Sequence, residues 1–568
     1  MNRLRLRTRH RFVPLALLGA LALSPACNKK DADQPAQQDQ DKAASSSSSS
    51  ATSSKTSEAP AAGGLVADPS DSPAIAEVGE VVATIQLPSG TKMSDVAAFI
   101  DYFQPGASMM LAMQLPALLE QAAGFDLGKS ARLDAPMSLL ILNPASHPKP
   151  LALLVEAKDP AKLSEQAKAE GHEVEQRDKL LLIGPAGVVD AAKDFAFANL
   201  TRYPDHSEII IYPKLLMSSY ASTLRDGIGA SMAVLGAGND GLAQMMRSYV
   251  EAIVALGEQT DRLVLSVGGG SGSADLIARV YPIQGSLLAS YIAAQTPSDH
   301  ALLSKLPAES GMMLASGHLR AGAAGDAFLD WSVKTMTPIY GSMSADEWMA
   351  LFKPWLDNLD GSFAMRMHMT MPTPTGQAAP VPAMQMHALL GINDATTLRA
   401  AWREMLNKMM AGAAIEMMGM KVIAKHTPDA LEHDGVPIDL YSTSVDASGL
   451  PPAQAAAMQA AGSGEQAMHL AAFDKVAAMT SADADGQTMR TLIDTVRGKQ
   501  GGLELSGNFA KALEASKQRG DSMLMVFDFA AVMASMPTPP PSPIPFSGMS
   551  VGVGKHDAAL SVRVSVLK

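Results

Sequence analysis

Cysteine and aromatic residues are scarce in this chain of 568 residues. Cys27 is the sole cysteine, and aromatic residues make up 5% of the sequence. A single cysteine excludes disulfide bonds within the chain, CxxC redox chemistry and cysteine-rich zinc sites. Hydrophobic residues still make up 47%, with 36 methionines, so methionine and alanine fill space that larger side chains fill elsewhere. The length predicts two or more domains.

Signatures of catalysis are missing as well. The twelve histidines form no HxxxH or HExxH spacing, and the sequence has no GxSxG elbow. His433 precedes Asp434-Gly435, a dipeptide that predicts a hairpin turn rather than a catalytic dyad. No second run of 18 apolar residues follows the N-terminal segment, so we expect a soluble body. We expect no catalytic residues, cofactor or metal; an enzyme whose groups come from distant positions is the remaining catalytic alternative.

The N-terminus has the parts of a secretory signal. Five arginines lie within residues 3–11, an apolar stretch covers residues 12–23, and "LSPAC" ends at Cys27. The apolar stretch is too short to span a bilayer. The segment resembles the lipobox of bacterial lipoproteins, in which the peptide is cut directly before a cysteine that is then acylated. Ala26 fits that pattern, while Ser24 stands where a leucine is usual and Leu23 lies one position earlier.

The resemblance implies a signal peptide at residues 1–26, lipid on Cys27 and attachment to the cell envelope. Asn28 is not the aspartate that retains many enterobacterial lipoproteins at the inner membrane, which favours the outer membrane, on its periplasmic or surface face. An ordinary secretory signal with an incidental cysteine is the alternative. Cleavage removes five arginines and no acid, so the net charge moves from −12 to −17. This acidity disfavours binding to nucleic acid or anionic lipid surfaces.

A tether is predicted after the cysteine. Residues 28–72 consist mainly of Ala, Ser, Gln, Asp, Lys and Pro, with six consecutive serines at residues 45–50. Such a segment cannot bury enough apolar surface to fold, so we expect residues 27–76 to be a disordered tether. As a flexible linker it would span roughly 35–40 Å root-mean-square. That reach would hold a folded body away from a membrane surface.

The body looks duplicated. "SVGGGSGSADLIARVYPI" from Ser266 matches "SVGVGKHDAALSVRVSVL" from Ser550, so that Arg279 corresponds to Arg563. Each predicts a strand, a glycine-containing turn and a second strand. Two further matches keep the same order: "LALLVEAKDPAKL" with "MHALLGINDATTL", and "SEIIIYPKLLMSSY" with "SMLMVFDFAAVMASM". Three matches in one order argue for two homologous halves.

The second match predicts a strand, an aspartate helix cap and an amphipathic helix in each half, with the caps at Asp159 and Asp394. We therefore predict an α+β protein of two tandem homologous halves, residues 77–300 and 301–568. Each half should have an antiparallel or mixed sheet with helices packed on one face. The layout resembles a loose class of uncharacterised bacterial secreted proteins with repeated α+β units, and this resemblance implies no activity.

Two glycine-rich segments raise the question of nucleotide binding. Gly236, Gly238 and Gly241 in "GAGNDG" have the GxGxxG spacing of dinucleotide-binding loops. The acids Glu258 and Asp261 precede the next predicted strand instead of following it, so we favour a break between two helices. "GGGSGS" at residues 268–273 lacks the Lys-Ser/Thr of a phosphate-binding loop, which favours a hairpin turn.

Methionine alternates with polar residues in "MRMHMTM", residues 365–371. Alternate residues of a strand share a face, so Met365 and Met367 are predicted to face the core while Arg366 and His368 face away. After a loop containing Pro and Gly, "MQMH" at residues 384–387 begins the return strand of a hairpin. The first half has Leu and Val at matching positions, which favours a packed core over a Cu(I) site of thioethers.

These patterns leave three hypotheses of function. The favoured one is a membrane-tethered, non-catalytic envelope lipoprotein that acts as a binding or structural module for an unknown protein or an apolar ligand. Duplication creates an interface between halves, where ligand clefts commonly form. The alternatives are a Cu(I)- or metal-handling periplasmic protein that uses the methionine strands, and a nucleotide-dependent enzyme that uses the GAGNDG loop.

The lipobox resemblance predicts that Cys27→Ser releases the protein into the soluble fraction. One acyl chain binds a membrane only marginally, whereas lipoprotein maturation adds more than one, so the anchor should depend wholly on this residue. Detergent phase partitioning of the wild type and the variant measures the change. A variant that still partitions into detergent as the wild type does would show that the cysteine is not the anchor.

Overall fold

The computed structural model describes residues 78–88, 94–103, 106, 108–110, 113, 127–200, 207–235, 240–270, 273–308, 311–319, 322–336, 344–370, 383–410, 415–417, 420–446, 465–481, 483, 485–530, 533 and 546–567. The predicted signal peptide, Cys27 and the predicted tether lie outside the described residues. The predicted halves, residues 77–300 and 301–568, are called the first half and the second half below.

The first half alternates strands with helices. Its elements are β1 (Val81–Leu87), α2 (Ser94–Phe103), β2 (Met137–Leu142), β3 (Leu151–Glu156), α4 (Pro160–Ala169), β4 (Glu173–Arg177), β5 (Leu180–Gly184), α5 (Val188–Asn199), β6 (Glu208–Ile211), α6 (Pro213–Leu235), α7 (Asp240–Glu258), β7 (Thr260–Gly270), β8 (Ser273–Pro282) and α8 (Leu287–Ala293).

The second half has the same alternation with additional strands. Its elements are η3 (Ala301–Lys305), β9 (Met313–His318), α9 (Gly322–Met336), α10 (Ala345–Asp357), β10 (Leu359–Thr370), β11 (Ala383–Ile392), α11 (Ala395–Met410), β12 (Ile415–Met417), β13 (Met420–His433), β14 (Val436–Asp446), β15 (Glu465–Phe473), β16 (Val476–Ser481), α13 (Gln487–Val496), α14 (Gly507–Arg519), β17 (Met523–Asp528), β18 (Gly548–His556) and β19 (Ala559–Leu567).

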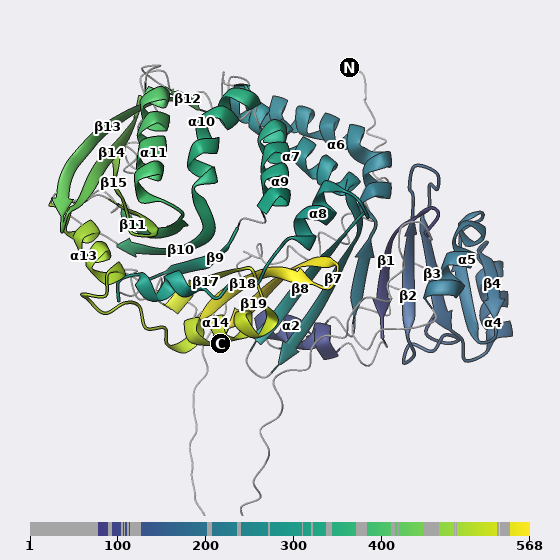
Figure 1. Ribbon diagram of the computed structural model, residues 1–568. Coiled ribbons are helices and arrows are strands. Elements are labelled where there is room, and N and C mark those ends of the chain that lie inside the picture. Colours follow the sequence, from purple (N-terminus) through teal and green to yellow (C-terminus); the bar gives the residue numbers. More distant parts are fainter. Residues whose placement is uncertain are drawn as a thin grey trace, which may run out of the picture. The chain divides into compact units, whose positions relative to one another are not determined.

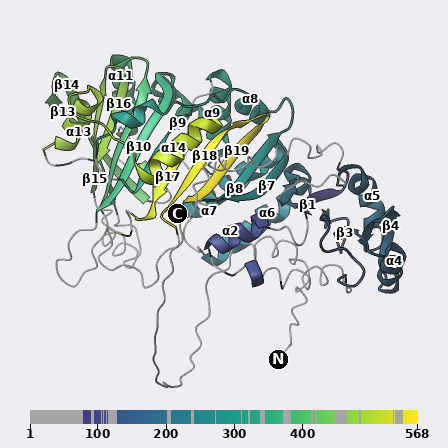
Figure 2. The same cartoon turned by 90° about the horizontal axis from the view of Figure 1, so that it is seen from below.

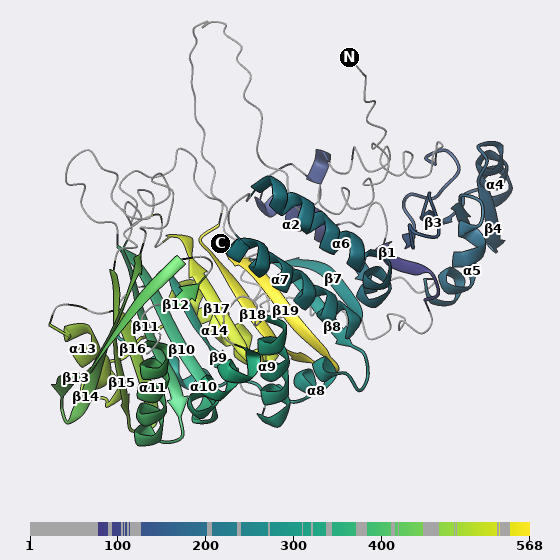
Figure 3. The same cartoon turned by 90° about the horizontal axis from the view of Figure 1, so that it is seen from above.

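The described strands of both halves form one sheet of 19 strands. Figures 1 and 3 show this sheet from two directions. Strand pairing gives the order β4-β5-β3-β2-β1-β6-β7-β8-β19-β18-β17-β9-β10-β11-β16-β15-β14-β13-β12. Every one of these pairs is antiparallel. The α+β class predicted from the sequence is confirmed, and the sheet is antiparallel rather than mixed.

The strand order repeats on the two sides of the β8–β19 pair. Outward from β8 the strands are β7, β6, β1, β2, β3, β5 and β4; outward from β19 they are β18, β17, β9, β10, β11, β16 and β15. In each half, these strands follow one another along the chain in the same sequence. The additional strands β12, β13 and β14 extend the second half beyond β15. The repeated order supports the division into two halves that we propose.

The helix caps agree with this correspondence. The Asp159 side chain accepts a 3.1 Å hydrogen bond from the Lys162 amide at the start of α4, and Asp394 accepts a 2.7 Å bond from the Thr397 amide at the start of α11. A side-chain acceptor at this position satisfies one of the first free N–H groups of a helix. The two caps predicted from the sequence are therefore confirmed.

The sequence matches are less regular inside the strands. Val267 pairs with Leu276 across the first hairpin, whereas Val551 pairs with Val564, so the gap-free match does not hold in both strands of the hairpin. In the third match, buried Ile210 is aligned with Met525, which lies between the two buried residues of β17, Leu524 and Val526. A shift of one residue is needed, because neighbouring residues of a strand face opposite sides.

Helices cover both faces of the sheet, not the single face that we expected. We call the face with Val264, Arg279 and Leu524 the arginine face, and the face with Ala278 and Met525 the methionine face. On the arginine face, α5, α13 and α14 pack in hydrophobic clusters. On the methionine face, α2, α4, α6 and α11 pack in others. Figure 1 shows α13 and α14 on the side opposite α11 and α10.

The methionine hairpin forms as predicted, but its buried polar residue is Arg366, whereas Met365, Met367 and His368 are half-buried. Met365 lies opposite Ala388 and Met367 opposite Met386, all on the methionine face. Arg366, predicted to face away from the core, is fully buried on the arginine face. With helices on both faces, alternation no longer separates a core side from a solvent side. The side chains of Met369 and Thr370, and all of Met371, lie outside the described residues.

The hairpin register predicts that Met365→Leu combined with Met367→Leu leaves stability nearly unchanged. Matching the hairpins through the caps places Leu139 and Ile141 of the first half at these positions, and Leu-for-Met exchanges in cores usually cost less than about 1.5 kcal/mol. Urea unfolding of the double variant measures the cost. The same pair of proteins should show equal affinity for Cu(I), and a tight site lost in the variant would restore the metal-handling hypothesis.

Candidate functional site at the junction of the two halves

The candidate site lies on the arginine face where β8 meets β19. Ala278 lies directly opposite Val562, and these residues correspond to each other in the sequence match. On the other face of the same strands, Arg279 is opposite Ser561 and Arg563 is opposite Ile277. Arg279 and Arg563 therefore lie on a common face as diagonal neighbours across the strand pair. Figure 2 shows β8 and β19 side by side, between β7 and β18.

Arg279 is buried without adequate partners. Only 4% of the residue is exposed, and within the described residues neither Nε nor Nη1 has a hydrogen-bond partner. Burying a polar group without a hydrogen bond is unfavourable, and burying a charge without a counter-charge is more so. A guanidinium in this situation is a candidate for recognition rather than for stability.

Arg563 shares this environment. Burial lowers the pKa of its guanidinium; Asp275 and Asp521 act in the opposite direction, while Arg519 and Arg279 lower the pKa further. A lowered pKa means that the surroundings disfavour the cation. Burial, the largest of these causes, is therefore what chiefly disfavours the cation at Arg563.

Two glycines of β18 make room for an ion pair over the sheet. The Arg519 guanidinium donates hydrogen bonds of 3.2 and 2.7 Å to Oδ2 of Asp521. A Cβ on Gly552 would lie 2.4 Å from this oxygen, and one on Gly554 would lie 2.9 Å from Cα of Asp521. We expected these glycines in a turn, but both lie within β18, and Asp557 has the positive φ of 51°. Close approach of another chain segment, not turn formation, is what requires glycine here.

Hydroxyl groups complete the candidate site. Ser266, Ser550 and Ser565 are buried on the arginine face of neighbouring strands. Within the described residues, Oγ of Ser266 and Oδ1 of Asp275 have no hydrogen-bond partner. Guanidinium and hydroxyl donors in this arrangement suit an oxyanion, because a guanidinium presents several N–H groups in one plane.

A second polar group crosses the sheet inside the second half. Arg366, His387, Thr480 and His469 lie opposite one another on β10, β11, β16 and β15, and each is at most 3% exposed. Nδ1 of His469 lies 3.6 Å from Oδ1 of Asp483, and burial lowers the pKa of this histidine. We call these four residues the buried polar row.

The first half has no such row. The matched hairpins place Leu140 and Ala152 at the positions of Arg366 and His387, and Gly184 at the position of Thr480. The same fold therefore accepts apolar or small residues at three of these four positions, while the exposed Glu173 stands at the position of His469. Sequence reasoning missed the row, although a comparison of "MSLLIL" with "FAMRMH" between the halves would have shown an arginine in place of a buried leucine.

A third polar cluster fixes α11 to the methionine face. Arg403 donates hydrogen bonds of 2.9 and 2.6 Å to the two carboxylate oxygens of Asp439, and Nε2 of His426 lies 3.0 Å from Oδ2. Burial opposes ionisation of Asp439, but hydrogen bonds from Arg403, the Asp429 amide and His426 hold its pKa below the ordinary value. This closed network has its charges paired, in contrast to the junction.

The GAGNDG segment is not flanked by the secondary structure that a dinucleotide-binding loop requires. Gly236 and Gly238 lie outside the described residues, and Gly241 lies in the first turn of α7. The chain before the segment is the helix α6, whereas the nucleotide interpretation requires a parallel strand. Of the other predicted turns, the one in GGGSGS lies partly outside the described residues, where β7 and β8 pair as a hairpin up to Gly270 and Ser273. Asp434 and Gly435 form the predicted turn between β13 and β14, with φ of 53° and 75°.

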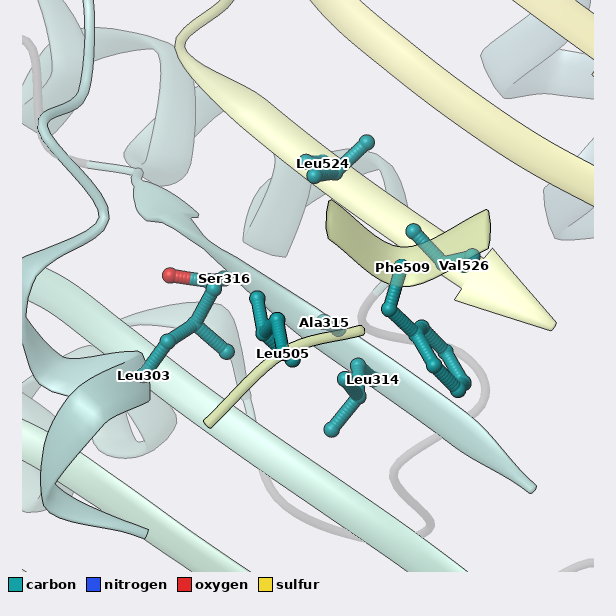
Figure 4. Close-up of a pocket in the computed structure, with 8 residues that line it drawn as sticks. All are labelled: Leu303, Leu314, Ala315, Ser316, Leu505, Phe509, Leu524 and Val526. Carbon is teal, nitrogen blue, oxygen red and sulfur yellow. The ribbon is translucent and has the colours of Figure 1, made fainter. Parts of the chain in front are cut away.

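A small pocket on the arginine face is apolar. Figure 4 shows the residues that line it: Leu303, Leu314, Ala315, Ser316, Leu505, Phe509, Leu524 and Val526. Its volume is about 10 Å³, roughly enough for one water molecule. Its one hydroxyl, on Ser316, donates a 3.1 Å hydrogen bond to the Phe363 carbonyl. We interpret this space as a gap in packing between α14 and the sheet, because no polar group points into it unsatisfied.

In the part of the chain that the structure describes, no three His, Cys, Asp or Glu residues are grouped as a metal ion would require. None of the helices described has both the length and the hydropathy to cross a bilayer. No protein-family description, curated protein or solved structure matches this chain. The function therefore has to be argued from the site itself.

The Asp439 network predicts a pH-dependent effect of Arg403→Met. Removing one partner of a buried ion pair costs about 3 kcal/mol, because the remaining charge is left uncompensated. The folded pKa of Asp439 lies below its unfolded value, so its contribution is present above about pH 4 and is lost as the pH falls further. Urea unfolding at pH 7 and at pH 3 should therefore show a large difference from wild type that shrinks in acid.

Arg225→Met is the matched control for that measurement. The Arg225–Glu251 pair is also bidentate, at 2.7 Å, but its side chains are 46% and 47% exposed. An exposed pair contributes about 1 kcal/mol or less. Equal losses in the two variants at pH 7 would contradict the role assigned to Asp439.

Proposed function

We propose that the protein is a membrane-tethered, non-catalytic lipoprotein of the cell envelope that acts as a binding module. The signal-like N-terminus, Cys27 and the linker composition of residues 28–72 support attachment at a distance from the membrane. The acidic composition supports a partner other than nucleic acid.

The observation that carries the binding role is the buried Arg279 at the junction. In the part of the chain that the structure describes, Nε and Nη1 of its guanidinium have no partner, and Arg563 from the other half is a diagonal neighbour. Groups of this kind destabilise the protein alone and are satisfied by a ligand. A ligand with an acidic group and an apolar part, or a protein segment that carries such a group, fits this chemistry.

The proposal predicts what wild-type and variant proteins retain when they are extracted from their native envelope. The full-length wild type should float with envelope vesicles and should carry a bound ligand or partner after mild detergent extraction, as measured by native mass spectrometry. The double variant Arg279→Met with Arg563→Met should float equally well but lose the bound species.

Two outcomes would contradict the proposal separately. Wild-type protein that stays in the soluble fraction would contradict the tether. Wild-type protein that floats but carries no bound species, or carries the same species as the double variant, would contradict binding at the junction.

A further inference from the structure

We propose that the junction binds a monovalent oxyanion, a carboxylate or a phosphodiester group, between Arg279 and Arg563. This inference rests on the proposed binding function and names the chemistry of the ligand. It concerns the arginine face of β8 and β19, with donors that come from both halves of the chain.

The balance of charge at the junction favours a single negative charge. Arg279, Arg563 and Arg519 are three cations, and Asp275 and Asp521 are the two acids that act on Arg563. The Arg519 guanidinium is already bound to Asp521. Among these five groups one positive charge is left over, and a monovalent anion would neutralise it.

The geometry of the donors favours an oxyanion. Nε and Nη1 of Arg279 lack partners within the described residues. They lie on different edges of the planar guanidinium, so each has an N–H group that can donate a hydrogen bond to an oxygen of a carboxylate or phosphate. Oγ of buried Ser266 also lacks a partner there, one strand away. An N–H donor cannot bind a metal cation, so these groups select for negative charge.

Access to the site is from the side of Arg563. Arg279 is almost fully buried, whereas Arg563 and Ser561 on β19 are half-buried. A ligand group can thus reach Arg279 past Arg563, and both guanidiniums would bind the same anion. Neither half alone supplies this pair.

The test is thermal unfolding of the full-length protein in detergent, with sodium acetate or sodium dimethyl phosphate compared with sodium chloride at equal ionic strength. The wild type should unfold at a higher temperature in at least one of the two oxyanions than in chloride. Arg279→Met should lose this response. In chloride the variant should unfold no earlier than the wild type, because an unpaired buried charge is replaced by an apolar side chain of similar length.

Arg262→Met is the matched control. Arg262 lies on the same face of β7, and its guanidinium is 2.7 Å from Asp261 and stacks on the ring of Tyr281. This variant should unfold earlier than the wild type in chloride but keep the full response to the oxyanion. If Arg279→Met does not fold, Arg563→Met tests the same site. This variant should also lose the response to the oxyanion.

The outcomes distinguish the sources of the anion and separate the inference from the proposed function. A response to acetate alone assigns a carboxylate, and a response to dimethyl phosphate alone assigns a phosphodiester. No response in the wild type to either anion, or an equal response in Arg279→Met, would overturn the site. If neither anion raises the unfolding temperature but a bound species is still recovered from the envelope, the protein binds a ligand at a place other than this site.

Discussion

The pairing of β8 with β19 is the constraint on which the rest of the structure depends. Each is the last strand of its half and would present a row of unpaired backbone groups if the halves were apart. Antiparallel pairing closes both edges and joins the halves into one sheet. The outer edges are protected differently: β4 carries the charged residues Glu173, Glu175 and Arg177, and β12 is three residues long. Charge and shortness both discourage pairing with another chain.

The same pairing explains where buried charge can be placed. The hydrophobic cluster around α5 fills the arginine face of the first half, and the clusters under α13 and α14 fill that of the second. The junction falls between them and is lined by arginine, serine and glycine. The halves also act as controls for one another, since Leu140 shows that the position of buried Arg366 accepts a hydrocarbon. The fold itself therefore does not require the polar residues at the junction or in the buried polar row.

Much of the fold could be predicted from local signals, because these depend on neighbours in sequence. The caps at Asp159 and Asp394, the Asp434-Gly435 turn and the pairing of the two methionine strands as a hairpin are of this kind. The burial of Arg366 could not be predicted, because it depends on helices that cover both faces of the sheet. Gly552 and Gly554 were mistaken for turn residues, since the reason for glycine there is Asp521, about 30 positions earlier in the chain.

The candidate site could be predicted only in part. The match of Arg279 with Arg563 was visible in the sequence, but whether the two strands would meet was not. Their burial and the orphaned donors of Arg279 come from tertiary packing, which alternation within one strand does not encode. The prediction that a ligand would bind between the halves remains a proposal, now with named residues.

The most direct test of the account is a disulfide across the junction. In a Cys27→Ser background, Ala278→Cys with Val562→Cys places two thiols on directly opposed residues, whose Cβ atoms lie about 4.5–5.5 Å apart in such pairs. Ala278→Cys with Val566→Cys is the control, because Val566 is four residues further along β19. If β8 pairs with β19, the first pair should cross-link rapidly under mild oxidation, seen as a mobility shift on a non-reducing gel, and the second pair should not. Equal cross-linking of both pairs, or of neither, would contradict the junction of β8 and β19.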